Sequence, residues 1–147
     1  MNIRQILIAL VVVIAVVAGA CSSNSDSTAA ETTTTTFDFP ELEFGRGVLP
    51  GSVPALWPTP DESVIGATMM DGTRRLTEIV ITYPATVSDV ASYYTTNLPV
   101  LGFEVTDASG TDGKFTIEFS GNGVTGTIVL TTGGTGLTAG TIEMVHQ

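Results

Sequence analysis

From residue 63 onward, apolar side chains recur at every second position in short runs, and this pattern limits what the chain can fold into. Ile79, Ile81 and Tyr83 alternate with mostly more polar neighbours. Such alternation is typical of strands that bury one face. Runs rich in strand-forming residues, separated by turn residues, cover 64–70, 76–83, 103–106, 115–119, 124–130 and 141–145. The pattern therefore predicts a sheet with one apolar face.

A single helix interrupts the strands. Its apolar positions recur at helical spacing, at Val87, Val90, Ala91, Tyr94 and Leu98. Thr86 stands where an N-cap is expected, and Asp89 follows three residues later in the first turn. Pro99 disfavours α geometry at the preceding residue, so we expect this helix to end near Asn97.

The turns set the fold class. Asp71-Gly72 and Asn122-Gly123 supply the positive φ values of tight hairpins, which join neighbouring antiparallel strands. We expect an α+β domain in the order ββαββββ, with a mostly antiparallel sheet of five to six strands and one helix packed on one face. The other face, carrying residues such as Glu78 and Glu118, is polar enough to meet water and flat enough to meet a partner.

Composition divides the chain into four parts. Residues 1–20 carry Arg4 and then an uncharged apolar run shorter than the roughly 20 residues of a membrane span, which predicts a signal peptide. Residues 21–36 are rich in Ser and Thr and lack large apolar side chains, as in a flexible tether. Residues 37–62 hold five of the seven prolines and predict an extended, irregular arm. Residues 63–147 form the α+β domain.

Val17-Ala18-Gly19-Ala20-Cys21 resembles the lipobox of bacterial lipoproteins, with Ala18 where that family most often has Leu. The resemblance implies cleavage between Ala20 and Cys21 and lipidation of Cys21, the only cysteine. The mature chain would then be held at the cell membrane on its extracytoplasmic face. The alternatives are a plain secretory signal followed by a coincidental cysteine, or an uncleaved membrane anchor.

The charge of the chain excludes one class of partner. The formal net charge of -10 becomes -11 once Arg4 leaves with the signal peptide. Nucleic-acid binding requires a surface rich in Lys and Arg, and the mature chain would keep only four such residues against fifteen acids. The basic cluster Arg74-Arg75 could meet an acidic partner or a lipid headgroup, although charges that protect a strand edge are the commoner reason for such a pair. Trp57 could contact a ligand, but we favour a role in pinning the arm onto the domain.

Little in the sequence indicates catalysis. His146 is the only histidine and stands next to the last residue, where we expect a frayed end, so no catalytic triad or multi-histidine metal site can be built. Residues 107–118 faintly mimic a calcium loop, but Asp112 replaces the required glycine and a hairpin explains the segment better. We expect neither cofactor nor metal. Paired carboxylates remain, either on the sheet as Glu78 with Glu118 or in the arm as Asp38, Glu41 and Glu43.

The helix and its exit, Val90-Ala91-Ser92-Tyr93-Tyr94 followed by Leu98 and Gly102-Phe103, resemble a class of poorly characterised bacterial lipoproteins, especially actinobacterial ones. That resemblance implies a fold and no catalytic residues. The leading hypothesis is a non-enzymatic, lipid-anchored module that binds an envelope protein or glycan. The alternatives are a small glycan-active hydrolase using paired carboxylates and a purely structural lipoprotein. The sequence leaves the oligomeric state open.

Overall fold

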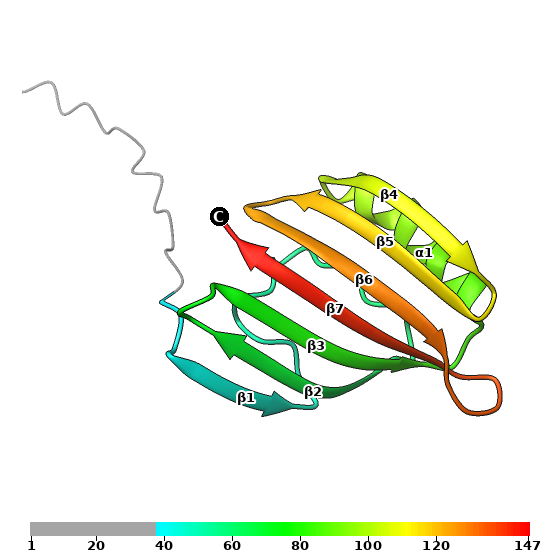
Figure 1. Cartoon of the computed structure of the whole chain (residues 1–147), viewed down its shortest axis with the longest axis horizontal. Coiled ribbons are helices and arrows are strands. Elements are labelled where there is room, and N and C mark those ends of the chain that lie inside the picture. The colour runs from blue at the N-terminus through cyan, green and yellow to red at the C-terminus, as the bar shows by residue number, and fades with distance from the viewer. Residues whose placement is uncertain (1–37) are drawn as a thin grey trace, which may run out of the picture. The chain divides into compact units, whose positions relative to one another are not determined.

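The computed structural model describes residues 38–147, which form a seven-stranded antiparallel sheet and one helix (Figure 1). The chain runs through β1 (Leu42–Arg46), β2 (Val64–Asp71), β3 (Leu76–Tyr83), α1 (Val87–Val100), β4 (Phe103–Thr111), β5 (Lys114–Gly121), β6 (Val124–Thr132) and β7 (Thr138–His146). Across the sheet the order is β1-β2-β3-β7-β6-β5-β4. The expected α+β class is confirmed.

The helix explains this strand order. After β3, α1 carries the chain across the sheet to its far edge, where β4 begins. Three hairpins then return strand by strand, so that β7 fits between β6 and β3. Strands β1 and β4 are left as the two edges of the sheet.

The expected count of five to six strands was too low. The additional strand, β1, lies within the proline-rich segment, and its five residues pair with β2 from Leu42 opposite Asp71 to Arg46 opposite Ala67. All five residues of β1 are exposed, so this strand has no buried face to produce a period-two signal. Its place in the sheet comes from the backbone ladder with β2, which composition does not reveal.

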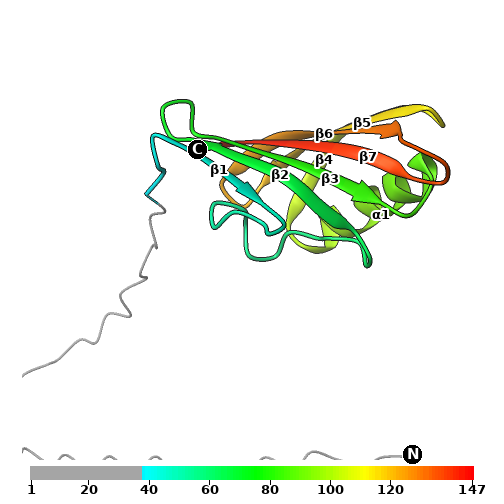
Figure 2. The same cartoon turned by 90° about the horizontal axis from the view of Figure 1, so that it is seen from below.

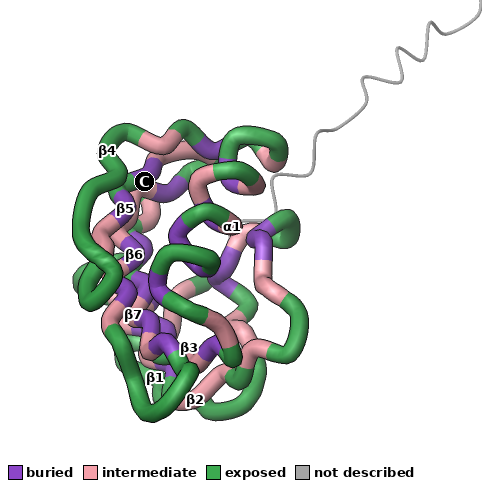
Figure 3. Tube along the Cα trace, turned by 90° about the vertical axis from the view of Figure 1, so that its right-hand side faces the viewer, coloured by how far each residue is buried: buried purple, intermediate pink, exposed green. Residues whose placement is uncertain are grey.

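One face of the sheet is covered by α1 and by the arm between β1 and β2 (Figure 2). Helix α1 contacts β4, β5 and β6. Val53 and Trp57 of the arm join the same buried cluster, whose central members include Ile79, Ile81, Ile117, Ile128, Leu130 and Ile142. Along much of β6 and β7, buried residues alternate with partly buried or exposed ones (Figure 3). We call this side the covered face.

Two glycines on the covered face make room for aromatic rings. A Cβ added at Gly126 would lie 2.6 Å from Cζ of Phe119, and one added at Gly140 would lie 2.7 Å from Cε2 of Tyr83. At Gly126 the added Cβ would also collide with the backbone oxygen of Glu143, so movement of the ring alone would not make room for it. These glycines therefore let large rings come close to the neighbouring strand, which a side chain at either position would prevent.

The helix begins as expected and ends later than expected. Thr86 is the N-cap, accepting a hydrogen bond of 3.2 Å from the backbone N–H of Asp89, and the five predicted apolar positions are all buried. The predicted end near Asn97 was wrong, because α1 continues through Pro99 to Val100. Leu98 is held in the core, and the amide of Leu101 donates to the carbonyl of Asn97, which closes the last turn.

The two predicted hairpin turns had different outcomes. Asn122 and Gly123 both have positive φ, at 50° and 79°, as the dipeptide predicts. In the β2–β3 turn, the residue with positive φ is Arg75, at 51°, rather than the expected Asp71-Gly72 dipeptide. Gly72 is instead pressed against the carbonyl oxygens of Phe39 and Pro40, where a Cβ would collide. Here a glycine provides close approach rather than backbone freedom.

Candidate functional site: the open face of the sheet

The side of the sheet opposite α1 has no element of residues 38–147 over its central strands, and we call it the open face. Along each strand, the residues of the open face alternate with those of the covered face. They are Glu78, Val80, Thr82, Thr116, Glu118, Thr125, Thr127, Val129, Thr141 and Glu143. These side chains range from partly buried to exposed. The open face therefore combines threonine and valine with carboxylates on a broad surface.

A row of carboxylates crosses the open face. In the strand register Asp107 lies opposite Glu118, Glu118 opposite Thr127, Thr127 opposite Glu143, and Glu143 opposite Glu78. Directly opposite residues share a face, with Cβ atoms about 5 Å apart. Four carboxylates thus stand in one line across five adjacent strands. We call these four residues the acidic row.

The acidic row opposes folding. Glu78 and Glu143 are direct cross-strand neighbours, as are Asp107 and Glu118, and like charges in that position are destabilising. Within residues 38–147, no member of the row has an ion-pair partner, since the ion pair there joins Arg74 to Asp71. The row therefore keeps its negative charge available to molecules outside the domain.

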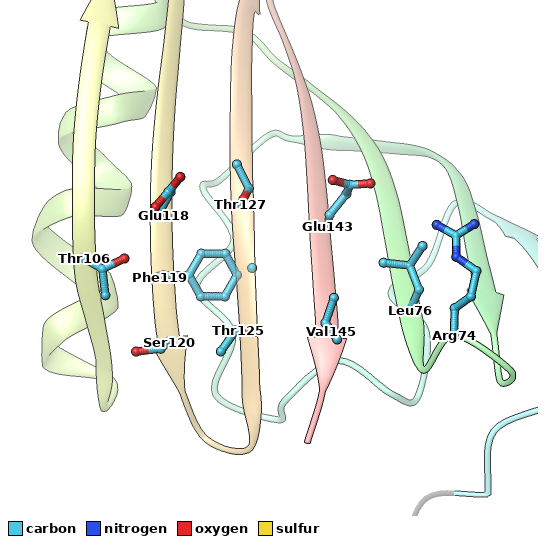
Figure 4. Close-up of a pocket in the computed structure, with 11 residues that line it drawn as sticks. Arg74, Leu76, Thr106, Glu118, Phe119, Ser120, Thr125, Thr127, Glu143 and Val145 are labelled. Atoms are coloured by element: carbon cyan, nitrogen blue, oxygen red, sulfur yellow. The ribbon is translucent and has the colours of Figure 1, made fainter.

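A shallow hollow of about 550 Å³ lies over the middle of the row. Figure 4 shows Glu118 and Glu143 on either side of Thr127, with Arg74 beyond Leu76. The rest of its lining comes from β4 to β7 and includes Thr106, Ser120, Thr125 and Val145. Hydroxyl, carboxylate and apolar groups therefore meet on one broad surface.

Glu78 and Glu118 lie on the same face but are not cross-strand neighbours. Three strand spacings separate them, which places their Cα atoms about 14 Å apart at roughly 4.8 Å per strand. The two carboxyl groups of a glycosidase stand at most about 9.5 Å apart, so the side chains of Glu78 and Glu118 would have to lean toward each other across β7 and β6 to form such a pair. Asp38, Glu41 and Glu43 are all exposed to solvent. Within the described residues the structure holds no group of three or more acidic, histidine or cysteine side chains suited to a metal ion.

The segment that mimics a calcium loop is a hairpin, as expected. Residues of β4 pair with β5 from Phe103 opposite Gly121 to Thr111 opposite Lys114, with a register shift between Val105 and Asp107. The side chain of Asp107 accepts a hydrogen bond of 3.0 Å from the Ser109 hydroxyl. Asp107 therefore belongs to a strand and faces Glu118 across the ladder.

Trp57 holds the arm on the covered face. Its ring is 7% exposed and lies 5.9 Å from Tyr94, 5.4 Å from Phe103 and 5.0 Å from Phe119 between ring centroids. These three neighbours come from α1, β4 and β5. The ring therefore joins three elements, and little of it is left to contact a partner.

Beside Trp57, two tyrosine hydroxyls bond to each other inside the core. Oη of Tyr83 and Oη of Tyr94 are 2.9 Å apart, and both side chains are fully buried. Burial raises the pKa of Tyr83 and the pKa of Tyr94, because a buried phenolate would lose its hydration. Both hydroxyls stay neutral and serve as a buried polar link between β3 and α1.

The structure separates the two residues of the basic cluster. Arg74 is largely exposed, with its side chain 3.8 Å from the Asp71 carboxylate and facing the hollow. Arg75 turns to the end of the chain, where its guanidinium donates to the backbone oxygen of Gln147 at 2.6 Å. Arg74 is therefore available at the rim of the open face, while Arg75 secures the C-terminal strand.

His146 is not the frayed end that the sequence suggested. It belongs to β7, and its Nε2 lies 3.0 Å from the hydroxyl of Thr77, which in turn lies 2.7 Å from the hydroxyl of Ser52 in the arm. The ring of Phe39 packs on it at 4.6 Å. Burial lowers the pKa of His146, and nearby Arg75 adds to that effect. No local pattern could reveal these contacts, since they join residues distant in sequence.

Ala20 and Cys21, the predicted cleavage and lipidation residues, lie outside the described residues. The described part defines an α+β protein with one covered and one open sheet face. Comparisons of the chain with protein families, with curated proteins and with solved structures found no match. Within residues 38–147, the helix is too short and too polar to cross a membrane.

Proposed function

We propose that this chain is a lipid-anchored module on the extracytoplasmic face of the cell membrane, where it binds another envelope component, a protein or a glycan. It acts by binding and carries out no reaction. The open face is the binding surface, and the observation that carries the proposal is the acidic row across it. The segment between β1 and β2 is less suited to this role, because its one aromatic ring, Trp57, is buried.

The loss of stability that the acidic row causes supports the open face as the binding surface. Two like-charge pairs, Glu78 with Glu143 and Asp107 with Glu118, weaken the sheet in which they stand. A surface needed for solubility alone could carry the same charge in turns, away from other carboxylates. Their alignment across adjacent strands fits a partner that supplies positive charge or hydrogen-bond donors to the row.

The membrane anchor has its own test. Mass spectrometry of the membrane fraction should find a mature chain that begins at Cys21 and carries lipid on it. A Cys21→Ser variant should appear outside the membrane fraction. A mature chain beginning elsewhere, or a Cys21→Ser variant that remains membrane-bound, would contradict the anchor without touching the open-face proposal.

The binding surface is tested by photo-crosslinking in intact cells. A photoreactive amino acid at Thr141, in the centre of the open face, should yield a discrete covalent adduct. The matched control carries the same amino acid at Thr96, an exposed threonine on the outer side of α1. Adducts from Thr141 and not from Thr96 support the proposal. An absence of adducts at Thr141, or the same adducts at both positions, contradicts it.

A further inference from the structure

We propose that the partner of the open face is a basic segment of another protein, which lies extended across the strands. Its cationic side chains meet the acidic row, and an apolar side chain meets Phe44. This inference rests on the proposed function and names the class of partner for the same surface. Two features carry it: the spacing of the carboxylates, and an exposed apolar end that lies in register with them.

The line of the acidic row continues beyond Glu78 to the edge of the sheet. Glu78 lies opposite Met69 of β2, and Met69 lies opposite Phe44 of β1. Directly opposite residues share a face, so one line of side chains crosses the whole sheet from Asp107 to Phe44. Six strand spacings of roughly 4.8 Å make this line about 29 Å long. We call it the transverse line.

The two ends of the transverse line differ in chemistry. Asp107 and Glu118 occupy the end at β4 and β5. The end at β1 and β2 is apolar, with Phe44 71% exposed and Met69 partly buried beside it. A partner that covers the whole line must therefore supply groups for carboxylates and a separate apolar group for Phe44.

Charge decides the class of partner. Among residues 38–147, no member of the acidic row has an ion-pair partner. An uncharged ligand would remove water from these carboxylates without supplying a counter-charge, which is costly. An acidic ligand would be repelled by the row and by the strongly acidic chain as a whole. The charge of the open face is therefore complementary to a cationic partner.

The basic residues on this side of the sheet leave the acidic row uncompensated. Arg74 pairs with Asp71 at the rim of the hollow. Lys114 stands four positions from Glu118 along β5, and Arg46 stands two positions from Phe44 along β1. At about 3.3 Å per residue, Lys114 lies about 13 Å from Glu118. Positive charge for the row must come from outside the domain.

The carboxylates form two pairs whose separation fits an extended chain. Asp107 neighbours Glu118, and Glu143 neighbours Glu78. Three strand spacings, about 14 Å, separate the centres of the two pairs. In an extended segment, alternate side chains face the same way, and residues two, four and six positions apart lie about 7, 13 and 20 Å apart. Basic residues four positions apart therefore match the two pairs.

The apolar end extends the same spacing. Phe44 lies two and a half strand spacings, about 12 Å, from the centre of the pair formed by Glu143 and Glu78. A residue four positions beyond the second basic residue would lie about 13 Å from it, over Phe44. The transverse line therefore fits a segment with basic residues at its first and fifth positions and an apolar residue at its ninth.

Thr127 favours an extended segment over a helix. It lies between the two carboxylate pairs and lines the shallow hollow of about 550 Å³ (Figure 4). The backbone of an extended segment has N–H and C=O groups available to a hydroxyl at this point. A helix uses those groups for its own hydrogen bonds.

Peptide binding to the full chain, purified from the membrane in an uncharged detergent, tests the spacing. The probe is Lys-Ser-Ser-Ser-Lys-Ser-Ser-Ser-Leu, with an uncharged fluorophore at its N-terminus and an amide at its C-terminus. The matched control, Lys-Lys-Ser-Ser-Ser-Ser-Ser-Ser-Leu, has the same composition with adjacent lysines. At low salt, fluorescence anisotropy should give the probe a Kd at least about fivefold lower than that of the control. Equal Kd values would overturn the inference.

A substitution at Phe44 tests the apolar end. Phe44→Ser should raise the Kd of the probe at least about threefold, and it should leave unchanged the Kd of a peptide that ends in Ser instead of Leu. Val100→Ser is the matched control, because Val100 is 79% exposed on α1 and lies away from the open face. Both positions are exposed, so neither substitution should unfold the domain. An equal effect of Phe44→Ser on the two peptides, or no effect on either, would overturn the inference.

The adduct captured at Thr141 in intact cells separates this inference from the proposed function. Mass spectrometry should find the photoreactive residue joined to a segment of a second protein with basic residues four positions apart. An adduct with a glycan would overturn the inference and leave the open face as a binding surface. An absence of adducts at Thr141 would contradict the proposed function and this inference together.

Discussion

The two faces of the sheet use the same strands for different purposes. On β6, Ile128 and Leu130 are fully buried under α1 and the arm, while Thr127 and Val129, which alternate with them, belong to the open face. The covered face supplies the apolar burial that stabilises the fold. The open face contributes charge, and with two like-charge pairs it reduces stability. Substitutions on the two faces should therefore differ in kind, with loss of folding on one and loss of binding on the other.

The largest effect is expected at Trp57. Replacing it with Ala removes a ring that contacts α1, β4 and β5 and should lower the free energy of unfolding by about 3–5 kcal/mol. Urea denaturation measures the loss. Leu56→Ala is the control, because this neighbour in the arm is 63% exposed and should change stability by less than about 0.5 kcal/mol. Equal effects at the two positions would show that the arm is not packed on the covered face.

Adjacent residues of β6 compare the two faces directly. Ile128→Ala should cost about 2–5 kcal/mol, because the side chain is fully buried and its loss leaves a cavity. Thr127→Ala, one residue away on the open face, should change stability by no more than about 0.5 kcal/mol. Thermal unfolding of the two variants gives the comparison. A loss at Thr127 as large as that at Ile128 would mean that the open face is covered in the folded protein.

A smaller effect, of opposite sign, is expected in the acidic row. Glu143→Gln should raise the free energy of unfolding by about 0.2–1 kcal/mol, because it removes the repulsion from Glu78 on the next strand. The gain should shrink as added salt shortens the Debye length from about 10 Å at 0.1 M to about 3 Å at 1 M. Once Glu78→Gln is present, Glu143→Gln should add little. A loss of stability, or a gain insensitive to salt, would contradict like-charge strain.

The smallest effect concerns His146, which joins Thr77 on the covered face to Phe39. Its pKa is lowered by burial and by Arg75, so the folded protein favours the neutral ring more than the unfolded chain does. This contribution is complete above about pH 6.5, the unfolded value, and is lost as the pH falls through the lower folded pKa. The melting temperature of His146→Gln should therefore fall less between about pH 7.5 and about pH 5.5 than that of the parent. If the melting temperatures of the parent and of His146→Gln fell equally with pH, this role of His146 would be contradicted.

The features that could be predicted from the sequence are those that depend on residues only a few positions apart. The buried positions of α1, its Thr86 cap and the Asn122-Gly123 turn follow from neighbours within a few residues, and the structure agrees with them. Strand β1, the course of α1 past Pro99 and the position of His146 depend on residues distant in sequence, and they were missed. In each case tertiary contacts outweighed local propensity.

The candidate site was predicted only in outline. Period-two alternation places Glu78 and Glu118 on the polar face, but it gives no strand order. The order of the strands puts three spacings between these two and brings Glu143 beside Glu78 instead. The acidic row can therefore be recognised only from the register of all five strands. That register depends on the long connection from β3 through α1 to β4.

The central claim is that the open face binds an envelope component, and charge reversal tests it most directly. Glu118→Lys with Glu143→Lys should reduce the adduct captured at Thr141 at least about tenfold while leaving the chain folded, because it opposes the charge that the row presents. The control, Asp61→Lys with Glu62→Lys, makes the same change in net charge at exposed positions outside the open face and should leave capture intact. Equal capture by the two folded variants would contradict the account.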